Sequence, residues 1–200
     1  QCLYSTHDKK NLFLFYYNDN WSSMIGYPAG HGQDNNINDH HFHWGYFIHA
    51  ASFMEQFEPS WADQWGGMIN LLIRDAASYD REDAEFPFLR NFSPYAGHSW
   101  ANGFATFPGG NDQESTSESM QFASSLIHWG TITENDDIRD LGIYIYTTEQ
   151  TAVEEYWFDI YERNFEISQP NQQYSLVSRV WGNSFDNGTL YLYSHLSSNY

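Results

Sequence analysis

The stretch that decides the fold is residues 38–46, Asn-Asp-His-His-Phe-His-Trp-Gly-Tyr. Asn38 and Asp39 are residue types that cap the N-terminus of a helix. An apolar pattern with helical spacing follows them and consists of Phe42, Tyr46, His49, Phe53 and Phe57. This spacing predicts a helix over residues 40–56, in which Asp39 and His43, four residues apart, lie on one face.

Three further helices are predicted along the chain. The second begins after Pro59 and ends near residue 78. In it, large apolar residues recur at helical intervals, and we expect these to be core residues: Trp61, Trp65, Met68 and Leu72. The third helix covers about residues 114–129 and the fourth about residues 136–161. The sequence therefore predicts a mainly α fold.

The segments between and around the helices are predicted to be loops and one hairpin. Residues 1–38 form a loop-rich entry segment, and the long loop 79–113 is a binding surface because it crowds Gly, Pro, His and aromatic residues together. Residues 174–193 alternate polar and apolar side chains around Asp186-Asn187-Gly188, which indicates a short β-hairpin within residues 163–200. Helical hairpins over residues 39–162 with long loops at one end are typical of an α/α toroid.

Composition limits the classes of partner. The formal net charge is −18, from 26 acidic and 8 basic residues, so the chain would repel nucleic acid and anionic membrane surfaces. Eight Trp and fifteen Tyr exceed what a core of this size needs, and flat rings with polar rims suit sugars. Cys2 is the only cysteine, which excludes an intrachain disulfide and a thiolate metal cluster. A neutral partner such as a polysaccharide is favoured.

Acidic residues in two places could carry chemistry. Asp39 and His43 share the face of the first helix, and Glu114 and Glu118 lie four residues apart at the start of the third, about 6 Å along its axis. Acids at a helix N-terminus also complement the helix dipole without any further role. The glutamates are therefore either a functional pair or a solvated helix end.

Two other kinds of catalytic site fit the sequence less well. A metal site is one, since Asp39 and three histidines, His40, His41 and His43, include good ligand types. However, adjacent histidines on a helix point about 100° apart, and the His-x-x-x-His spacing of zinc proteases is missing. A serine hydrolase is the other, but the chain has no Gly-x-Ser-x-Gly elbow.

The motifs resemble those of glycoside hydrolase family 81. Residues 38–46 and residues 111–121, Asn-Asp-Gln-Glu-Ser-Thr-Ser-Glu-Ser-Met-Gln, look like family signatures. Residues 90–101 and 154–158 are similar to the same family, so the likeness covers most of the chain from Tyr27 on. The resemblance implies an endo-acting, inverting β-1,3-glucanase (laminarinase) with its cleft on an (α/α)6 barrel. Family members are several times longer and place a β-sandwich before the barrel, so residues 1–200 correspond to part of a single helical catalytic domain.

The resemblance also assigns roles to the acidic residues. Asp39 matches the family's proton donor, and His43 would position it. Glu114 and Glu118 both match the family motif; we favour Glu114 as the base because it lies at the junction of loop and helix, and expect Glu118 to orient the water. An acid at a helix N-terminus is stabilised as the anion, so burial or nearby glutamates must raise the pKa of Asp39.

The expected partner is β-1,3-glucan, bound by a secreted, monomeric enzyme without a cofactor or metal. Residues with rings or amides are the candidates for substrate contacts: His31, Trp44, Tyr95, His98, Trp100 and Asn102. Two alternatives stay open. One is a non-catalytic carbohydrate-binding module, in which the rings matter and the acids do not. The other is a toroidal glycosidase that acts on a different β-glucan.

Overall fold

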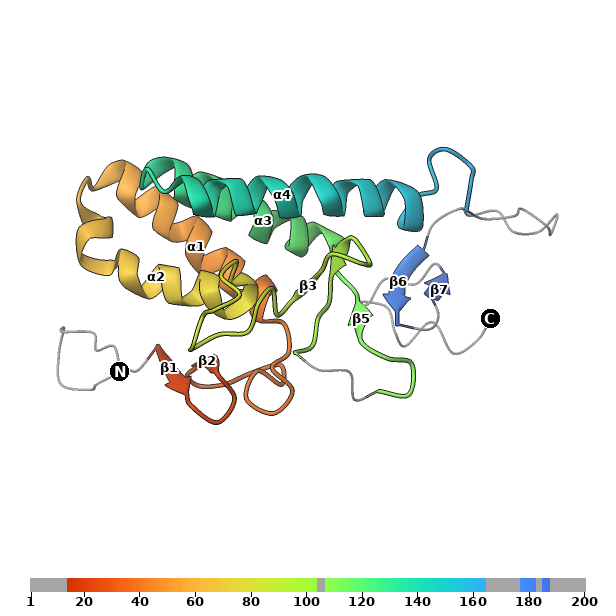
Figure 1. Cartoon of the computed structure of the whole chain (residues 1–200), viewed down its shortest axis with the longest axis horizontal. Helices are drawn as coiled ribbons and strands as arrows, with labels where there is room; N and C mark the ends of the chain where they lie inside the picture. Colours follow the sequence, from red (N-terminus) through yellow and green to blue (C-terminus); the bar gives the residue numbers. More distant parts are fainter. Residues whose placement is uncertain (1–13, 104–106, 165–176, 183–184, 188–200) are drawn as a thin grey trace.

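The computed structural model describes residues 14–103, 107–164, 177–182 and 185–187. Within them, helices dominate (Figure 1): α1 (His40–Phe57), α2 (Trp61–Ala77), α3 (Thr116–Ile132) and α4 (Asp136–Ala152). Helix α1 packs against both α2 and α3, and α3 also packs against α4. The mainly helical fold is confirmed, and the bounds of α1 and α2 agree closely with the sequence prediction.

Short antiparallel strands lie below and to the right of the helices in Figure 1. They form two pairs and one three-stranded sheet: β1 (Phe15–Asn18) with β2 (Ser23–Gly26), β3 (Phe92–Ser93) with β4 (His98–Ser99), and β5 (Asp112–Gln113), β6 (Val177–Trp181) and β7 (Phe185–Asn187) in that order. Pairing of Gln113 with Val180 brings a late segment of the chain beside the start of α3.

The β6–β7 pair confirms the predicted hairpin, but the predicted turn is wrong. Asp186 and Asn187 lie inside β7, opposite Arg179 and Val177, so the chain reverses before Phe185. Residues 174–176 and 188–193 of the predicted hairpin lie outside the described residues, as do residues 1–13 of the entry segment.

The core fills the space where α1, α2 and α3 meet. Its buried apolar residues include Ile48, Ala51, Ile69, Leu72, Ile73, Phe122, Leu126 and Trp129. Of the residues predicted to form the core of α2, Leu72 is buried, and Trp61 and Met68 pack against the cluster while partly exposed. Removal of this apolar surface from water is the main stabilising term of the fold.

Helix α1 was predicted correctly, but of the apolar pattern predicted for it only Phe42 is fully buried. Phe57 is 79% exposed, and Tyr46 and Phe53 are also exposed, whereas His40 and Trp44 are buried. Apolar residues occur on both faces of α1, so periodicity alone could not choose between them. The hydrogen bond between His40 and Asp75 compensates for the loss of water around the buried imidazole, so the face that carries His40 can lie inside the fold.

Helices α3 and α4 approach each other closely through glycine. A Cβ atom at Gly142 would lie 2.8 Å from the backbone nitrogen of Ile127 and 2.9 Å from the carbonyl oxygen of Ala123. Asn135 caps α4, because its side chain accepts a hydrogen bond of 3.2 Å from the Ile138 N–H. The α-helix is shorter than predicted, since α4 ends at Ala152. A π-helical turn, Val153–Trp157, follows it directly.

None of the helices in the described ranges is both long and apolar enough to cross a bilayer.

Candidate active site

Asp39 lies directly before α1 in a left-handed conformation, with φ of 61°. Its backbone N–H donates to the Ala101 carbonyl at 2.8 Å, and its own carbonyl accepts from the His43 N–H at 2.9 Å. The carboxyl group makes no capping hydrogen bond to α1 in the described structure, so the predicted N-cap interaction is wrong. The left-handed backbone, which few non-glycine residues adopt, turns this side chain away from the helix N–H groups.

The surroundings of Asp39 favour its neutral form. The residue is 9% exposed, and its Oδ1 atom is buried without a hydrogen-bond partner among the described residues. Burial, together with the negative charges of Glu114, Asp112 and Glu118, raises the pKa of Asp39 to about 7. The carboxyl group can therefore hold a proton near neutral pH, as a general acid must.

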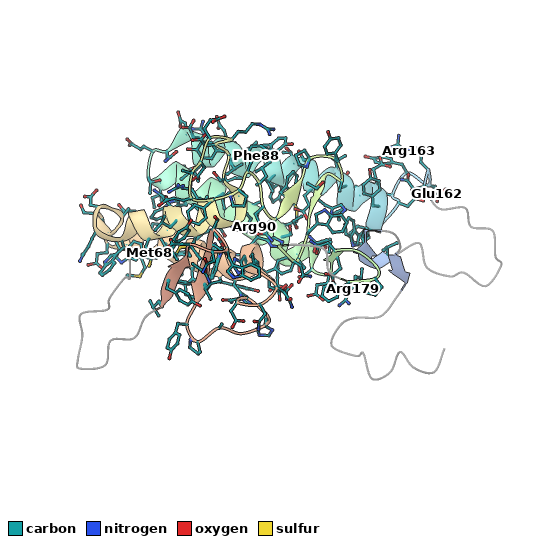
Figure 2. All side chains as sticks on the ribbon, turned by 60° about the horizontal axis from the view of Figure 1, so that its bottom comes forward. Met68, Phe88, Arg90, Glu162, Arg163 and Arg179 are labelled. Atoms are coloured by element: carbon teal, nitrogen blue, oxygen red, sulfur yellow. The ribbon has the colours of Figure 1, made fainter. Side chains whose placement is uncertain are left out.

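Glu114 follows β5 and precedes α3, so it does not share a helical face with Glu118 as the sequence spacing predicted. The Nη2 atom of Arg179 donates to Oε2 of Glu114 at 2.5 Å, and Figure 2 labels Arg179 beside β6. Burial raises the pKa of Glu114, and the guanidinium charge of Arg179 opposes that rise. Arg179 thus favours the carboxylate, the form that can take a proton from water.

Asp112 completes the acidic cluster, which we define as Asp39, Asp112, Glu114 and Glu118, and Tyr46 binds one of its members. Asp112 lies 3.7 Å from Nε of Arg179, measured to its Oδ2 atom. The hydroxyl of Tyr46 donates to Oε1 of Glu118 at 2.9 Å, which raises the pKa of Tyr46. Sequence reasoning assigned no site role to Asp112, Tyr46 or Arg179, because only the folded chain brings them together.

His43 is half-buried one turn after Asp39, and its ring packs edge-on against that of His31, with centroids 5.4 Å apart. The side-chain amide of Gln33 contacts Nδ1 of His43. Burial lowers the pKa of His43, the neighbouring His31 and His40 lower it further, and Glu118 opposes them. The imidazole is therefore neutral at neutral pH.

A pocket of about 240 Å³ opens beside His43. Gln33 and Tyr46 line it together with Tyr27 and Pro28, and Trp44 forms part of its wall. Trp44 is only 1% exposed, and its indole N–H donates to Oδ2 of Asp75 at 2.7 Å. Little of the Trp44 side chain is therefore open to a ligand, and its contact with substrate stays a prediction.

The other predicted substrate residues divide into exposed and buried groups. Tyr95 is fully exposed between β3 and β4, His31 is exposed, and Trp100 is half-buried. His98 and Asn102 are buried, and their contact with a ligand stays a prediction. His98 Nδ1 lies 2.8 Å from the Ser99 carbonyl, and the Asn102 amide donates to Oδ1 of Asp112 at 3.2 Å.

Two buried carboxylates behind the cluster escaped the sequence analysis. Asp75 of α2 accepts hydrogen bonds from Ser23 and the Met24 N–H, both at 2.9 Å, and Trp44 also donates to it. Burial would raise the pKa of Asp75, but His40 and Arg90 lower it overall; Figure 2 labels Arg90.

The second buried carboxylate, Glu149 of α4, ties together the segments that carry the glutamates. It accepts from the Ser99 N–H at 3.2 Å, the Ser119 hydroxyl at 2.6 Å and the Gln113 amide at 3.1 Å. Burial raises the pKa of Glu149, against the effect of these hydrogen bonds. An acid on a polar helix gives no sequence signal that it will be buried.

Comparison with known proteins agrees with this arrangement. A family description, "Glycosyl hydrolase family 81 C-terminal domain", matches residues 2–195. A glucan endo-1,3-beta-D-glucosidase of Acetivibrio thermocellus is 53% identical over 174 residues, 86% of this chain and 22% of its own length. One of Thermobifida fusca is 42% identical over 86% of this chain and 23% of its own length.

A solved structure of glycoside hydrolase family 81 from Clostridium thermocellum superposes with a TM-score of 0.82 and 51% identity, over 88% of this chain and 24% of that one. The chain thus spans less than a quarter of the length of these relatives. The match of nearly the whole sequence and of its fold shows that the chain belongs to glycoside hydrolase family 81 and corresponds to the C-terminal domain of that family.

Proposed function

We propose that this chain supplies the acid and the base of an endo-acting β-1,3-glucan hydrolase. The observation that carries the proposal is the contrast between two carboxyl groups. Burial among other acids raises the pKa of Asp39 to about 7. Burial also raises the pKa of Glu114, but the guanidinium of Arg179, which binds Glu114, opposes that rise. Carboxyl groups whose environments differ in this way are suited to opposite roles in proton transfer.

The names of relatives support the choice of substrate. The two bacterial relatives are called glucan endo-1,3-beta-D-glucosidases, and the one from Acetivibrio thermocellus is identical at more than half of the aligned positions. Relatives of Schizosaccharomyces pombe and soybean at about 30% identity carry the same activity in their names. The proposed substrate is therefore β-1,3-glucan.

In the proposed reaction, Asp39 protonates the departing glycosidic oxygen while Glu114 takes a proton from the attacking water. The C–O bond to the leaving sugar breaks as the bond from water to the anomeric carbon forms, with inversion. Such a mechanism needs the two carboxyl groups about 6.5–9.5 Å apart, with room for the water between them. Asp39 precedes α1 and Glu114 follows β5, so the two carboxyl groups come from different elements of the fold.

The wider architecture and location are also part of the proposal. We infer that α1 to α4 belong to an (α/α)6 barrel, supported by their arrangement as two packed helical hairpins. We infer export from the cell, because an endo-acting enzyme must meet its polysaccharide where that polymer is deposited. We further infer that the enzyme acts as a monomer.

The stereochemical course tests the mechanism. The full-length protein is incubated with laminarin, and proton NMR follows the new reducing ends before they mutarotate. Inversion yields the α-anomer first; an initial β-anomer would show a retaining enzyme with a covalent intermediate. Cellulose, xylan and mixed-linkage glucan assayed in parallel test the substrate.

The Asp39→Asn variant tests the proposed acid, because it keeps the shape of the side chain and removes the transferable proton. We expect turnover on laminarin to fall by about two to four orders of magnitude, with the fold intact. Near-normal turnover would reject Asp39 as the acid. Binding of β-1,3-glucan by the unmodified protein without release of oligosaccharides would instead favour a carbohydrate-binding module.

A further inference from the structure

We propose that Gln33 is a positioning residue that fixes His43 in one neutral tautomer, with its proton on Nε2 and its lone pair on Nδ1. Gln33 lies in the loop between β2 and α1 and is buried. The tautomer itself follows from geometry alone. Its importance for turnover rests on the proposed function, in which His43 serves the reaction beside Asp39.

The orientation of the Gln33 amide is fixed by a backbone group. The N–H of Gly26 donates to Oε1 of Gln33 at 3.2 Å. A backbone N–H can only donate, so the oxygen of the amide must face Gly26 and its NH2 group must face the other way. That NH2 group contacts Nδ1 of His43.

The orientation of the amide then decides where the proton of His43 sits. An amide NH2 group can only donate, so Nδ1 of His43 must accept and cannot itself carry a proton. A neutral imidazole with a bare Nδ1 carries its proton on Nε2. A charged imidazolium would set an Nδ1–H against the NH2 group of Gln33, which disfavours it, in the same direction as burial of the ring.

A buried chain of hydrogen bonds holds the backbone of Gln33 in place. Nε2 of His40 lies 3.1 Å from the Gln33 carbonyl oxygen, and Nδ1 of His40 lies 2.6 Å from Oδ2 of Asp75. His40 and Asp75 are both fully buried. Asp75 of α2, His40, Gln33 and His43 are therefore linked by successive hydrogen bonds. These bonds and the one from Gly26 oppose a 180° rotation of the Gln33 side-chain amide.

The fixed tautomer gives His43 a defined role at the cluster. Within the described residues Nε2 of His43 has no protein hydrogen-bond partner. The ring lines the pocket together with Tyr46, whose hydroxyl donates to Glu118 of the acidic cluster. His43 can therefore donate a hydrogen bond from Nε2 to a substrate hydroxyl or to a carboxylate, while its basic nitrogen is occupied. The ionisable groups that act on it are His31, His40 and Glu118. His43 is thus a donor and not a second base.

Histidine nitrogen NMR reads the tautomer directly. The full-length protein is labelled with 15N-histidine, without substrate, and the His43 signals are identified by their loss in the His43→Gln variant. We expect an unprotonated Nδ1 and a protonated Nε2 from pH 6 to pH 8. A proton on Nδ1, or rapid exchange between both tautomers, would overturn the proposal.

Two variants, one of Gln33 itself and one of its neighbour Gly26, test whether the Gln33 amide determines the tautomer of His43. In Gln33→Glu a carboxylate replaces the donor, so Nδ1 must carry a proton and the pKa of His43 rises. In Gly26→Ala the new Cβ would lie 2.7 Å from Oε1 of Gln33, which displaces the amide without changing its chemistry. Both changes should shift the His43 nitrogen signals, whereas Gln56→Glu, an equal charge change at an exposed position of α1, should not. Unchanged signals in Gln33→Glu would refute the proposal.

Turnover separates this inference from the proposed function. Loss of one well-placed hydrogen bond should lower kcat on laminarin by about 10-fold to 100-fold in Gln33→Glu. The expected tautomer in a protein that hydrolyses no glucan would leave the inference standing and reject the function. Hydrolysis by a protein with the opposite tautomer would reject only the inference.

Discussion

Tyr46 of α1 donates a hydrogen bond of 2.9 Å to Oε1 of Glu118 on α3, and Arg179 of β6 donates one of 2.5 Å to Oε2 of Glu114. The two glutamates therefore differ in their partners. A neutral phenol binds one of them and a cation binds the other. This difference is the basis on which their roles can be told apart.

We predict that Glu114→Gln abolishes turnover on laminarin, whereas Glu118→Gln leaves measurable activity. The base is indispensable to an inverting reaction, and a group that only orients the water usually matters less. Release of reducing sugar under matched conditions measures both variants, with circular dichroism as the check on folding. If Glu118→Gln is the more damaging change, the two glutamates exchange roles.

Removal of the Arg179 charge should shift the pH dependence of activity. The guanidinium opposes the effect of burial, so Arg179→Met lets the pKa of Glu114 rise further. A base works only when unprotonated, so the acid limb of the kcat/KM profile should move to higher pH. Arg179→Lys keeps a positive charge and should shift the limb less. An acid limb that stays in place in Arg179→Met would show that Glu114 is not the base.

Asp39 should cost the protein stability at neutral pH. Its pKa is raised from 3.8 to about 7, so its protonated form is stable in the fold, and stability is lost as pH rises from about 4 through about 7. Asn carries no charge at any pH, so Asp39→Asn should be the more stable protein at pH 8, by up to roughly 4 kcal/mol. The advantage should vanish near pH 4. Thermal unfolding at pH 4, 6 and 8 measures it, and a gap independent of pH would contradict the raised pKa.

Substitution of Trp44 should affect stability before it affects binding. Trp44→Phe removes the indole N–H that donates to Asp75 and leaves a buried carboxylate oxygen with one partner fewer. We expect a loss of about 1–3 kcal/mol in the free energy of unfolding. Urea denaturation measures it, with Phe57→Leu at an exposed position as the control. Unchanged stability with weaker glucan binding would instead show that Trp44 contacts the substrate.

Trp100 and Tyr95 form a matched pair for substrate contact. Trp100→Ala should weaken glucan binding by about 1–3 kcal/mol if its half-buried ring stacks on a sugar. It should also lower Tm, because the ring packs against His98 with centroids 4.5 Å apart. Tyr95→Ala should leave Tm unchanged, since that side chain is fully exposed. Affinity for laminarin oligosaccharides measures both, and a lower Tm with normal affinity would make Trp100 a purely structural residue.

Local signals predicted the helices, and distant contacts decided most of what the sequence missed. Pro59 and the periodic apolar residues set the bounds of α1 and α2, because these signals act within a few residues. The start of α3 was predicted about two residues too early, because Glu114 and Ser115 form the link from β5 to the helix, and β5 itself exists only through pairing with β6, far along the chain. The hairpin turn failed similarly, since Asp186 and Asn187 are held in β7 by pairing with β6.

The candidate site was only partly predictable for the same reason. Asp39, Glu114 and Glu118 were found through motifs, and the structure places all three within electrostatic reach of one another. Burial of His98 and Asn102 could not be predicted, because polar residues in a loop give no sign of what will cover them. The site role of Arg179 was missed because nothing in the residues around it indicates that it will meet Glu114.

Because Arg179 belongs to β6, it is synthesised after the helices and after the acidic residues that it binds. The helices from α1 to α4 all precede β6 in the chain and can pack on one another before residues 177–181 are synthesised, whereas the pairing of β5 with β6 must wait for that later segment. Until that segment arrives, Asp112 and Glu114 lack the cation that offsets their mutual repulsion. Glu114, the proposed base, therefore gains its cation only after the helical scaffold of this region has been synthesised.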